Sequence, residues 1–241
     1  MPSSRSPVDV DLLFDQALFA GLDPRHVQEI ARGASVVEAK RGSRILGRGD
    51  RLEGLYVITE GRLKLYMLSC SGDERVLRVL EPGDSFGEAI MFNDLPSPVF
   101  VDTLTAASLA YFPRDVINAA LVRDPDFTHT MLRSMSALMR NLITDLETCC
   151  LQNALQRTVS YLLRTAGEAP APHDRIVLPA AKAVVASTLN ISAETFSREL
   201  HRLQEQGLIG IDKRTIVLHD RKALVALAEG GAVVSMSGVR H

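Results

Sequence analysis

Residues 179–209 have the sequence PAAKAVVASTLNISAETFSRELHRLQEQGLI, and this stretch decides the fold of the C-terminal part of the chain. It contains two short segments of helical periodicity, separated by a turn at residues 188–191. The first segment is expected to begin near Pro179, because proline is favoured in the first turn of a helix. Ser192 is a favourable N-cap for the second segment, whose core-facing residues are Phe196, Leu200 and Leu203. The pattern predicts a helix-turn-helix.

The second helix has a polar face that is suited to DNA bases. Arginine can donate two hydrogen bonds to guanine O6 and N7, and glutamate can accept one from cytosine N4. The N-terminal part of this helix is the part that enters the major groove in helix-turn-helix proteins. For any one residue the alternative is a solvated face, since acidic residues are favoured in every first turn by the helix dipole. Their combination favours DNA contact by Glu194, Thr195, Ser197, Arg198 and His201.

A β-hairpin is expected directly after this helix. Residues 208–211 and 215–218 have the apolar composition of short strands, and the polar residues 212–214 join them. We interpret the hairpin as a wing whose tip residue Lys213 contacts a DNA phosphate. Arg214 beside it is a second candidate, although solvated charges are also common in turns.

A heptad pattern precedes the helix-turn-helix. Its apolar residues are alternately three and four apart, which is the spacing of a coiled-coil seam: Leu132, Met135, Met139, Leu142, Leu146 and Cys149. A strict seven-residue repeat favours supercoiling against a partner helix. Leu138 and Ile143 broaden the stripe, so packing against the chain's own domain is the alternative. We expect a homodimer through the first five seam residues, with Asn153 as the hinge and the N-cap of the next helix.

Residues 34–112 contain many short apolar strands that are interrupted by glycine. Examples are residues 55–58, 63–67 and 76–80. This composition is typical of a small barrel or jelly-roll, and helices are expected around residues 23–31 and from Pro113. The fold class is therefore α+β, with a β-roll, a long dimerisation helix and a C-terminal winged helix-turn-helix.

Length and composition agree with several domains in a cytoplasmic protein. The expected parts are residues 10–125 (sensor), 126–152 (dimer helix and hinge), 153–229 (winged helix) and 230–241 (disordered tail). The chain has a net charge of −2 and three cysteines, with no secretion signal or apolar run of about 20 residues. The adjacent Cys149 and Cys150 are interpreted as reduced thiols, although a redox role beside the hinge is the alternative. Motifs of common enzyme classes, such as a P-loop, HExxH, GxSxG or CxxC, are absent, so we expect a protein that is not an enzyme.

Over residues 18–227 the sequence resembles the CRP/FNR family of transcription regulators. The β-roll segments RGSRILGRGD, GLYVITEGRLKLY and LEPGDSFGEAIMF carry the resemblance, together with ISAETFSR in the second helix. The resemblance implies that Glu194, Ser197 and Arg198 contact a TTGAT-like half-site, and that RNA polymerase is a partner. Through GEAIMFND, LQNALQR and ETFSR the chain is most similar to the branch of dissimilatory nitrate respiration regulators (Dnr).

The effector is less well determined by the resemblance. Cyclic-nucleotide binders of the family place Arg-Ser where this chain has Pro98 and Val99, which offer no partner for a phosphate. We therefore expect no cyclic AMP binding, although the effector pocket is expected around Gly87, Glu88 and Met91. The iron–sulfur sensor of the FNR type needs a cluster of N-terminal cysteines, but residues 1–33 have none, so we expect no iron–sulfur cluster. We expect no other metal site either.

Haem that responds to nitric oxide is a candidate effector, because some Dnr-type regulators bind haem. This chain has Gln16-Ala17 where that branch can carry histidines, and His26, His129 and Met91 are the substitute ligands to consider. The alternative function is a cyclic-nucleotide-responsive regulator or regulatory subunit.

Overall fold

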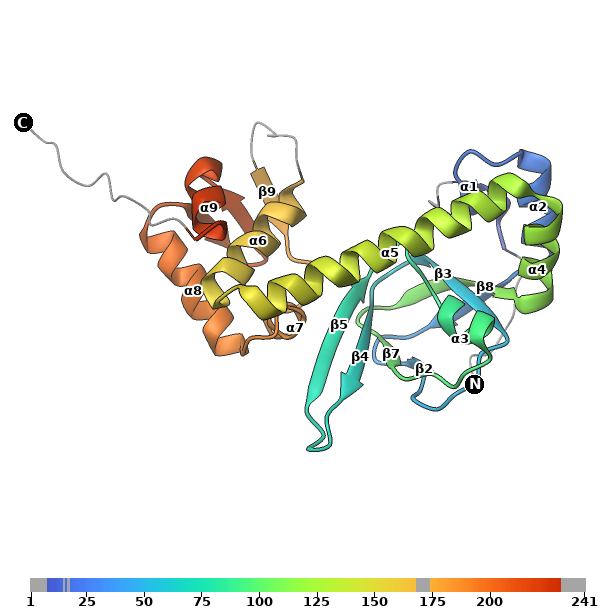
Figure 1. Ribbon diagram of the computed structural model, residues 1–241, viewed down its shortest axis with the longest axis horizontal. Coiled ribbons are helices and arrows are strands. Elements are labelled where there is room, and N and C mark those ends of the chain that lie inside the picture. The colour runs from blue at the N-terminus through green and yellow to red at the C-terminus, as the bar shows by residue number, and fades with distance from the viewer. Residues whose placement is uncertain (1–7, 15, 17, 168–173, 231–241) are drawn as a thin grey trace, which may run out of the picture. The chain divides into compact units, whose positions relative to one another are not determined.

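The computed structural model describes residues 8–14, 16, 18–167 and 174–230 of the 241-residue chain. It divides into two compact units, Met1–Asn141 and Leu142–His241. Figure 1 labels the helices and strands of both units. Among the described residues, no helix is long and apolar enough to cross a membrane. The predicted disordered tail lies outside this part of the chain, apart from Gly230.

Two antiparallel four-stranded sheets form the centre of the N-terminal unit. Their strand orders are β1-β8-β3-β6 and β2-β7-β4-β5. The strands are β1 (Ser35–Ala39), β2 (Arg44–Leu46), β3 (Gly54–Glu60), β4 (Leu63–Leu68), β5 (Glu74–Leu80), β6 (Ser85–Phe86), β7 (Phe100–Thr103) and β8 (Ala107–Pro113). The predicted strands at 55–58, 63–67 and 76–80 correspond to β3, β4 and β5, which confirms the β-roll.

Strand alternation places the core of the β-roll. Ile58, Leu63 and Leu109 are fully buried in one apolar cluster to which both sheets contribute. The turn between β3 and β4 depends on Gly61, whose φ is 85°. A Cβ at this position would lie 2.3 Å from the carbonyl oxygen of Ala106, so a side chain does not fit without a backbone shift. Glycine at this position lets the turn from β3 to β4 pack against the backbone at the start of β8.

Helices cover this sheet core. They are α1 (Val10–Phe14), α2 (Pro24–Gly33), α3 (Glu88–Asn93), α4 (Arg114–Arg123) and the first part of α5 (Pro125–Leu151). The predicted helices at 23–31 and after Pro113 are α2 and α4. Phe19 packs between Phe112 of β8 and Phe127 of α5, with ring centroids 5.3 and 6.1 Å apart. These buried rings join the N-terminal segment, the sheet and α5 into one core.

The C-terminal unit combines a helical core with a small sheet. Its elements are the last ten residues of α5, α6 (Ala154–Ala166), β9 (Asp174–Val177), α7 (Lys182–Thr188), α8 (Ala193–Glu205), β10 (Ile209–Asp212), β11 (Thr215–Leu218) and α9 (Arg221–Ala228). The antiparallel sheet has the order β10-β11-β9. The predicted helix-turn-helix and hairpin are confirmed as α7, α8 and β10–β11, whereas β9 and α9 were not predicted.

The predicted start of the first helix of this motif was wrong. The helix begins at Lys182, three residues after Pro179. The reason is that Leu178, which directly follows β9, is still hydrogen-bonded to the hairpin: its N–H donates to the carbonyl oxygen of Arg214 at 2.9 Å. Pro179 and Ala180 form a bend that leads from the sheet to α7.

Candidate nucleic-acid interface

Helix α8 is fixed by a cap at one end and by a buried stripe along one side. The Ser192 hydroxyl accepts a hydrogen bond from the backbone N–H of Thr195 at 3.0 Å, as an N-cap does. Phe196, Leu200 and Leu203 are each fully buried in the core of the C-terminal unit. Because three anchors lie on one side, the opposite side of the helix is held outward.

The outward side of α8 carries four of the five residues of this helix that were predicted to contact DNA. Glu194, Ser197, Arg198 and His201 are all exposed. The side chain of Arg198 is 65% exposed and that of His201 is 73% exposed. Thr195 differs, since it is half-buried and its hydroxyl is hydrogen-bonded to that of Ser192 at 2.9 Å. Thr195 therefore supports the cap, and the accessible polar face consists of the other four residues.

A buried carboxylate beneath this face was not predicted. Glu199 is 8% exposed, and its two oxygens lie 3.8 Å from Arg198 Nε and 3.9 Å from Arg202 Nη1. Its Oε2 atom is buried and has no hydrogen bond in the structure. The sequence does contain a signal, because Glu199 falls three residues after Phe196 on the apolar stripe. This carboxyl group is therefore a neighbour of the guanidinium that is expected to contact bases.

The wing has two exposed cations at its tip, one of which is held by a hydrogen bond to the backbone. Lys213 is exposed and adopts a left-handed backbone conformation with a φ of 53°. Arg214 donates from Nη2 to the carbonyl oxygen of Leu178 at 2.6 Å, which ties its side chain to the end of β9. Of the two candidates for binding phosphate, the structure therefore favours Lys213.

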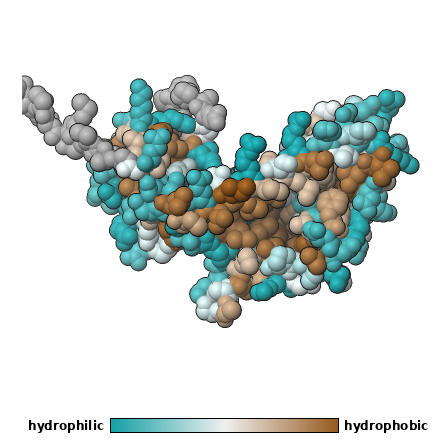
Figure 2. Space-filling view, viewed as in Figure 1, coloured by the Kyte–Doolittle hydropathy of each residue, from teal (hydrophilic) through white to brown (hydrophobic). Residues whose placement is uncertain are grey.

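The predicted dimer seam is uncovered on α5. Its residues are exposed by these fractions: Leu132 58%, Met135 39%, Met139 63%, Leu142 59% and Leu146 65%. Figure 2 shows apolar side chains gathered along the course of α5. Within the part of the chain that the structure describes, this stripe is not buried, so the alternative that the seam packs against its own domain is not favoured.

The predicted hinge residue forms a complete capping box. Asn153 Oδ1 accepts from the N–H of Gln156, and Gln156 Oε1 accepts from the N–H of Asn153, both at 3.0 Å. This reciprocal pair gives acceptors to two N–H groups at the start of α6 that have no hydrogen-bond partner within the helix. The sequence predicted the cap at Asn153 but not the role of Gln156.

Comparisons with known proteins agree with this geometry. Residues 36–124 match the cyclic nucleotide-binding domain family, and residues 156–227 match the Crp-like helix-turn-helix domain family. The chain is 33% identical over 162 residues to "Probable transcriptional regulator flp" of Lacticaseibacillus casei, covering 66% of this chain and 72% of that protein. It is 22% identical to the "CRP-like cAMP-activated global transcriptional regulator" of Mycobacterium tuberculosis, over 90% and 99% of the two chains.

The chain belongs to the CRP/FNR family of transcription regulators. Its fold is similar to that of FixK2 from Bradyrhizobium japonicum, with a TM-score of 0.70 and 21% identity over 80% of this chain and 96% of that one. It is a DNA-binding regulator with an effector-binding domain, and not an enzyme.

In this CRP/FNR regulator the three predicted effector-pocket residues lie around the start of α3. Gly87 precedes the helix with a φ of 107°, where a Cβ would lie 2.5 Å from a methyl carbon of Leu52. Burial raises the pKa of Glu88, and the hydrogen bond with Ser85 opposes this effect only in part. Met91 is 2% exposed and belongs to the core. The polar group that this region offers is therefore a largely buried carboxyl group whose pKa lies above its ordinary value.

Cyclic-nucleotide binders place Arg-Ser where this chain has Pro98 and Val99. Here the polar groups of the neighbouring Ser97 are already hydrogen-bonded to the backbone. The buried Ser97 hydroxyl donates to the carbonyl oxygen of Val99 at 2.9 Å and lies 3.3 Å from the N–H of the same residue. The Ser97 N–H donates to the carbonyl oxygen of Asp50 at 2.8 Å. Pro98, at the tip of this bend, is exposed and has no N–H to donate.

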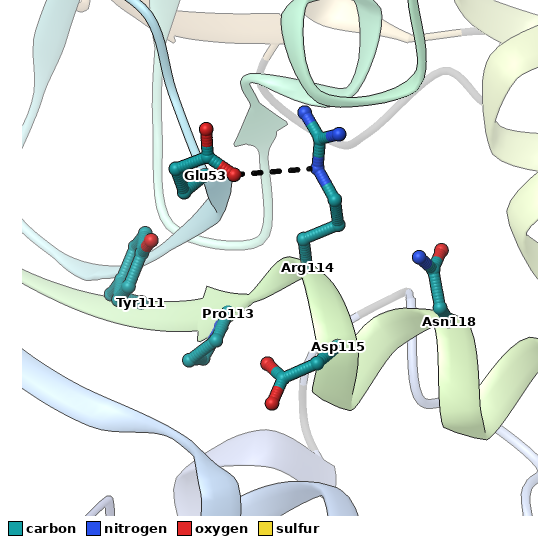
Figure 3. A pocket seen from close by; sticks show the side chains of 6 residues that line it. All are labelled: Glu53, Tyr111, Pro113, Arg114, Asp115 and Asn118. Atoms are coloured by element: carbon teal, nitrogen blue, oxygen red, sulfur yellow. Dashed lines mark ion pairs between the residues drawn. The ribbon is translucent and has the colours of Figure 1, made fainter. Parts of the chain in front are cut away.

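Two cavities of the effector-binding domain lie at other positions. One is open, has a volume of about 430 Å³ and is lined by Glu53, Tyr111, Pro113, Arg114, Asp115 and Asn118. Figure 3 shows the Glu53 carboxylate directed toward the Arg114 guanidinium. The other, of about 180 Å³, is lined by residues of α2 and α4 and includes His26.

The candidate haem ligands do not form a haem site in this structure. His26 Nδ1 lies 2.6 Å from Asp124 Oδ2 and is engaged by that carboxylate. His129 is exposed on α5, whereas Met91 is buried in the core.

Proposed function

We propose that the chain works as a homodimer that binds a TTGAT-like inverted repeat through α8. In this proposal Arg198 donates to the guanine of each half-site, Glu194 accepts from a cytosine, and Ser197 and His201 line the same contact. Lys213 on the wing contacts a phosphate. The observation that carries the proposal is the exposed polar face of α8 opposite three fully buried anchors.

The dimer supplies the symmetry that such a site needs. The uncovered stripe on α5 gives each chain a self-complementary apolar surface. Two recognition helices then require inverted half-sites about one helical turn, roughly 34–36 Å, apart. An effector bound in the N-terminal unit would shift the packing of the two α5 helices and thereby the winged helices about Asn153. RNA polymerase is the expected protein partner in the cytoplasm, by family resemblance.

The effector is proposed to be something other than cyclic AMP. The Mycobacterium tuberculosis relative is cAMP-activated, but here Pro98 replaces a donor, and the Ser97 hydroxyl is engaged with Val99. Haem remains a candidate through the Dnr-like segments, and the absorbance spectrum of protein purified with haem available tests it. In this structure His26, His129 and Met91 do not come together as a ligand set for haem.

One observation favours the alternative of a cyclic-nucleotide-responsive regulator. Glu88 is retained beside Gly87 in a matching cyclic nucleotide-binding domain. Titration calorimetry with cyclic AMP and cyclic GMP separates the two proposals, because only the alternative predicts saturable heat.

Gel-shift titrations over a salt series test how the protein binds DNA. The duplexes are a TTGAT palindrome and a scrambled sequence of equal composition. The wild type should prefer the palindrome. Lys213→Ala should weaken both duplexes alike and flatten the salt dependence by about one unit for each phosphate that the variant no longer binds. A wild type without preference for the palindrome, with every effector tried, would overturn the proposal.

A further inference from the structure

A single guanidinium connects the end of the dimer helix to the turn of the helix-turn-helix. Arg157 Nη2 donates to the carbonyl oxygen of Cys149 at 2.7 Å, and its Nε donates to that of Gln152 at 2.9 Å. Its Nη1 donates to the carbonyl oxygens of Leu189 and Asn190 at 3.3 and 3.2 Å. One side chain therefore bonds four backbone carbonyls from two separate segments of the C-terminal unit.

These carbonyls lie at helix ends, where the helix itself supplies no donor. The last four carbonyls of a helix have no partner within the helix, and α5 ends at Leu151, two residues after Cys149. Leu189 is the C-cap of α7, and Asn190 follows it with a φ of 57°. Arginine suits both ends at once, because its planar group offers several donors in a fixed geometry.

Two further contacts lie along the same face of α6, the second of them an ion pair between half-exposed side chains. Ser160 donates to Gln152 Oε1 at 3.1 Å, and Arg164 Nη1 lies 3.1 Å from Asp145 Oδ1. Residues 157, 160 and 164 are three and four apart, so they share one side of the helix. The end of α5 and α6 thus form a helical hairpin that is held across the capped Asn153.

We propose that Arg157 fixes the angle between the dimer helix and the helix-turn-helix, and that it thereby sets the half-site spacing that the dimer accepts. The inference rests on the proposed dimer. Leu142 and Leu146 of the seam lie in the same compact unit as α8, so a fixed angle at Arg157 transmits the seam geometry to the recognition helix. Each inserted base pair moves one half-site by about 3.4 Å and rotates it by about a tenth of a turn. If Arg157 holds this connection rigid, a change of half-site spacing lowers the affinity for DNA. A loose connection lets the two recognition helices adjust to the new spacing.

The test compares duplexes that differ only in the spacing of two TTGAT half-sites. The spacing that the wild type binds best is used, together with versions one or two base pairs longer or shorter, and a duplex with one half-site. Arg157→Met keeps an unbranched aliphatic side chain but loses every N–H donor. Arg157→Lys keeps the positive charge but lacks the planar guanidinium group that bonds several carbonyls at once. Arg164→Met is the matched control, because it removes only an ion pair between half-exposed side chains.

Arg157→Met should remain dimeric and bind the single half-site within about twofold of the wild type. Its preference for the best spacing should fall roughly tenfold, which corresponds to about 1.4 kcal/mol, and Arg157→Lys should show the same direction. Arg164→Met should behave as the wild type.

If Arg157→Met is folded and dimeric but discriminates spacing as sharply as the wild type, the inference is wrong. It is also wrong if single half-site binding collapses, because Arg157 would then support the recognition unit itself. If Arg157→Met fails to fold, the same two measurements, spacing preference and binding of the single half-site, are made on Arg157→Lys and test the inference. If the wild type itself prefers no palindrome at any spacing, the proposed function is wrong. That result differs from the two results that would contradict only the role of Arg157.

Discussion

Replacing Leu142 by alanine should weaken the dimer by an amount that follows from its exposure. Leu142 is 59% exposed in the single chain, so more than half of its burial remains to be gained on association. Full burial of a leucine side chain stabilises by about 1.5–3 kcal/mol, so the gain is about 1–2 kcal/mol for each copy. A symmetric dimer loses it twice, about 2–4 kcal/mol, which corresponds to roughly 30- to 700-fold weaker association.

Sedimentation equilibrium over a wide range of protein concentration measures this change. Val122→Ala is the matched control, since Val122 is 86% exposed on α4 and lies outside the seam. Val122→Ala should associate as the wild type does. The reasoning is refuted if Leu142→Ala and Val122→Ala have equal dimer dissociation constants, because exposure on α5 would then not mark the interface.

Three further predictions concern single residues or the effector. Glu88→Gln should flatten the dependence of stability on pH: burial raises the pKa of Glu88 in the folded state, so the folded protein binds the extra proton and its stability falls as the pH rises above the ordinary glutamate range. Unfolding free energies at several pH values measure this, and an equal slope in the variant would contradict it. Asn153→Ala should lower the unfolding free energy by about 1 kcal/mol in denaturant titrations through loss of the cap, whereas an unchanged midpoint would show that the cap is dispensable. Calorimetry with millimolar cyclic AMP should give no saturable heat, and micromolar binding would overturn our interpretation of Pro98 and Val99.

Features that depend on local sequence were predicted well. Ser192 and Asn153 act as caps because a side-chain oxygen beside the first helical turn needs no distant partner. The strands β3, β4 and β5 were predicted from the alternation of apolar and polar residues, which is visible within a few neighbouring positions. The exposed face of α8 followed from the spacing of three apolar anchors.

Features that depend on distant partners were not predicted. Strand β9 is four residues long and exists because it pairs with β11, some 40 residues later. That pairing also shifted the start of α7 away from Pro179. The bonds of Arg157 to Leu189 and Asn190 join segments that are more than 30 residues apart. A single sequence does not contain such pairings as a local pattern.

The identity of the effector could not be predicted from the sequence for a related reason. The resemblance predicted an effector pocket around Gly87, Glu88 and Met91, and the structure has Gly87 and Glu88 at the start of α3. Which molecule binds depends on how side chains from several elements come together. His26 illustrates this, since it is engaged by Asp124 from 98 positions away.

The most direct test of base contact by α8 combines a protein change with a change of one DNA atom. The TTGAT guanine in both half-sites is replaced by 7-deazaguanine, which lacks the N7 acceptor, and gel-shift titrations compare the wild type with Arg198→Ala on both duplexes. If Arg198 bonds this guanine, the wild type should bind the substituted palindrome roughly tenfold or more weakly, because a bidentate pair is worth about 1–3 kcal/mol in each half-site. Arg198→Ala should bind the two duplexes equally, since the missing N7 atom has no arginine partner in that variant. Equal sensitivity of the wild type and Arg198→Ala to the substitution would contradict the account.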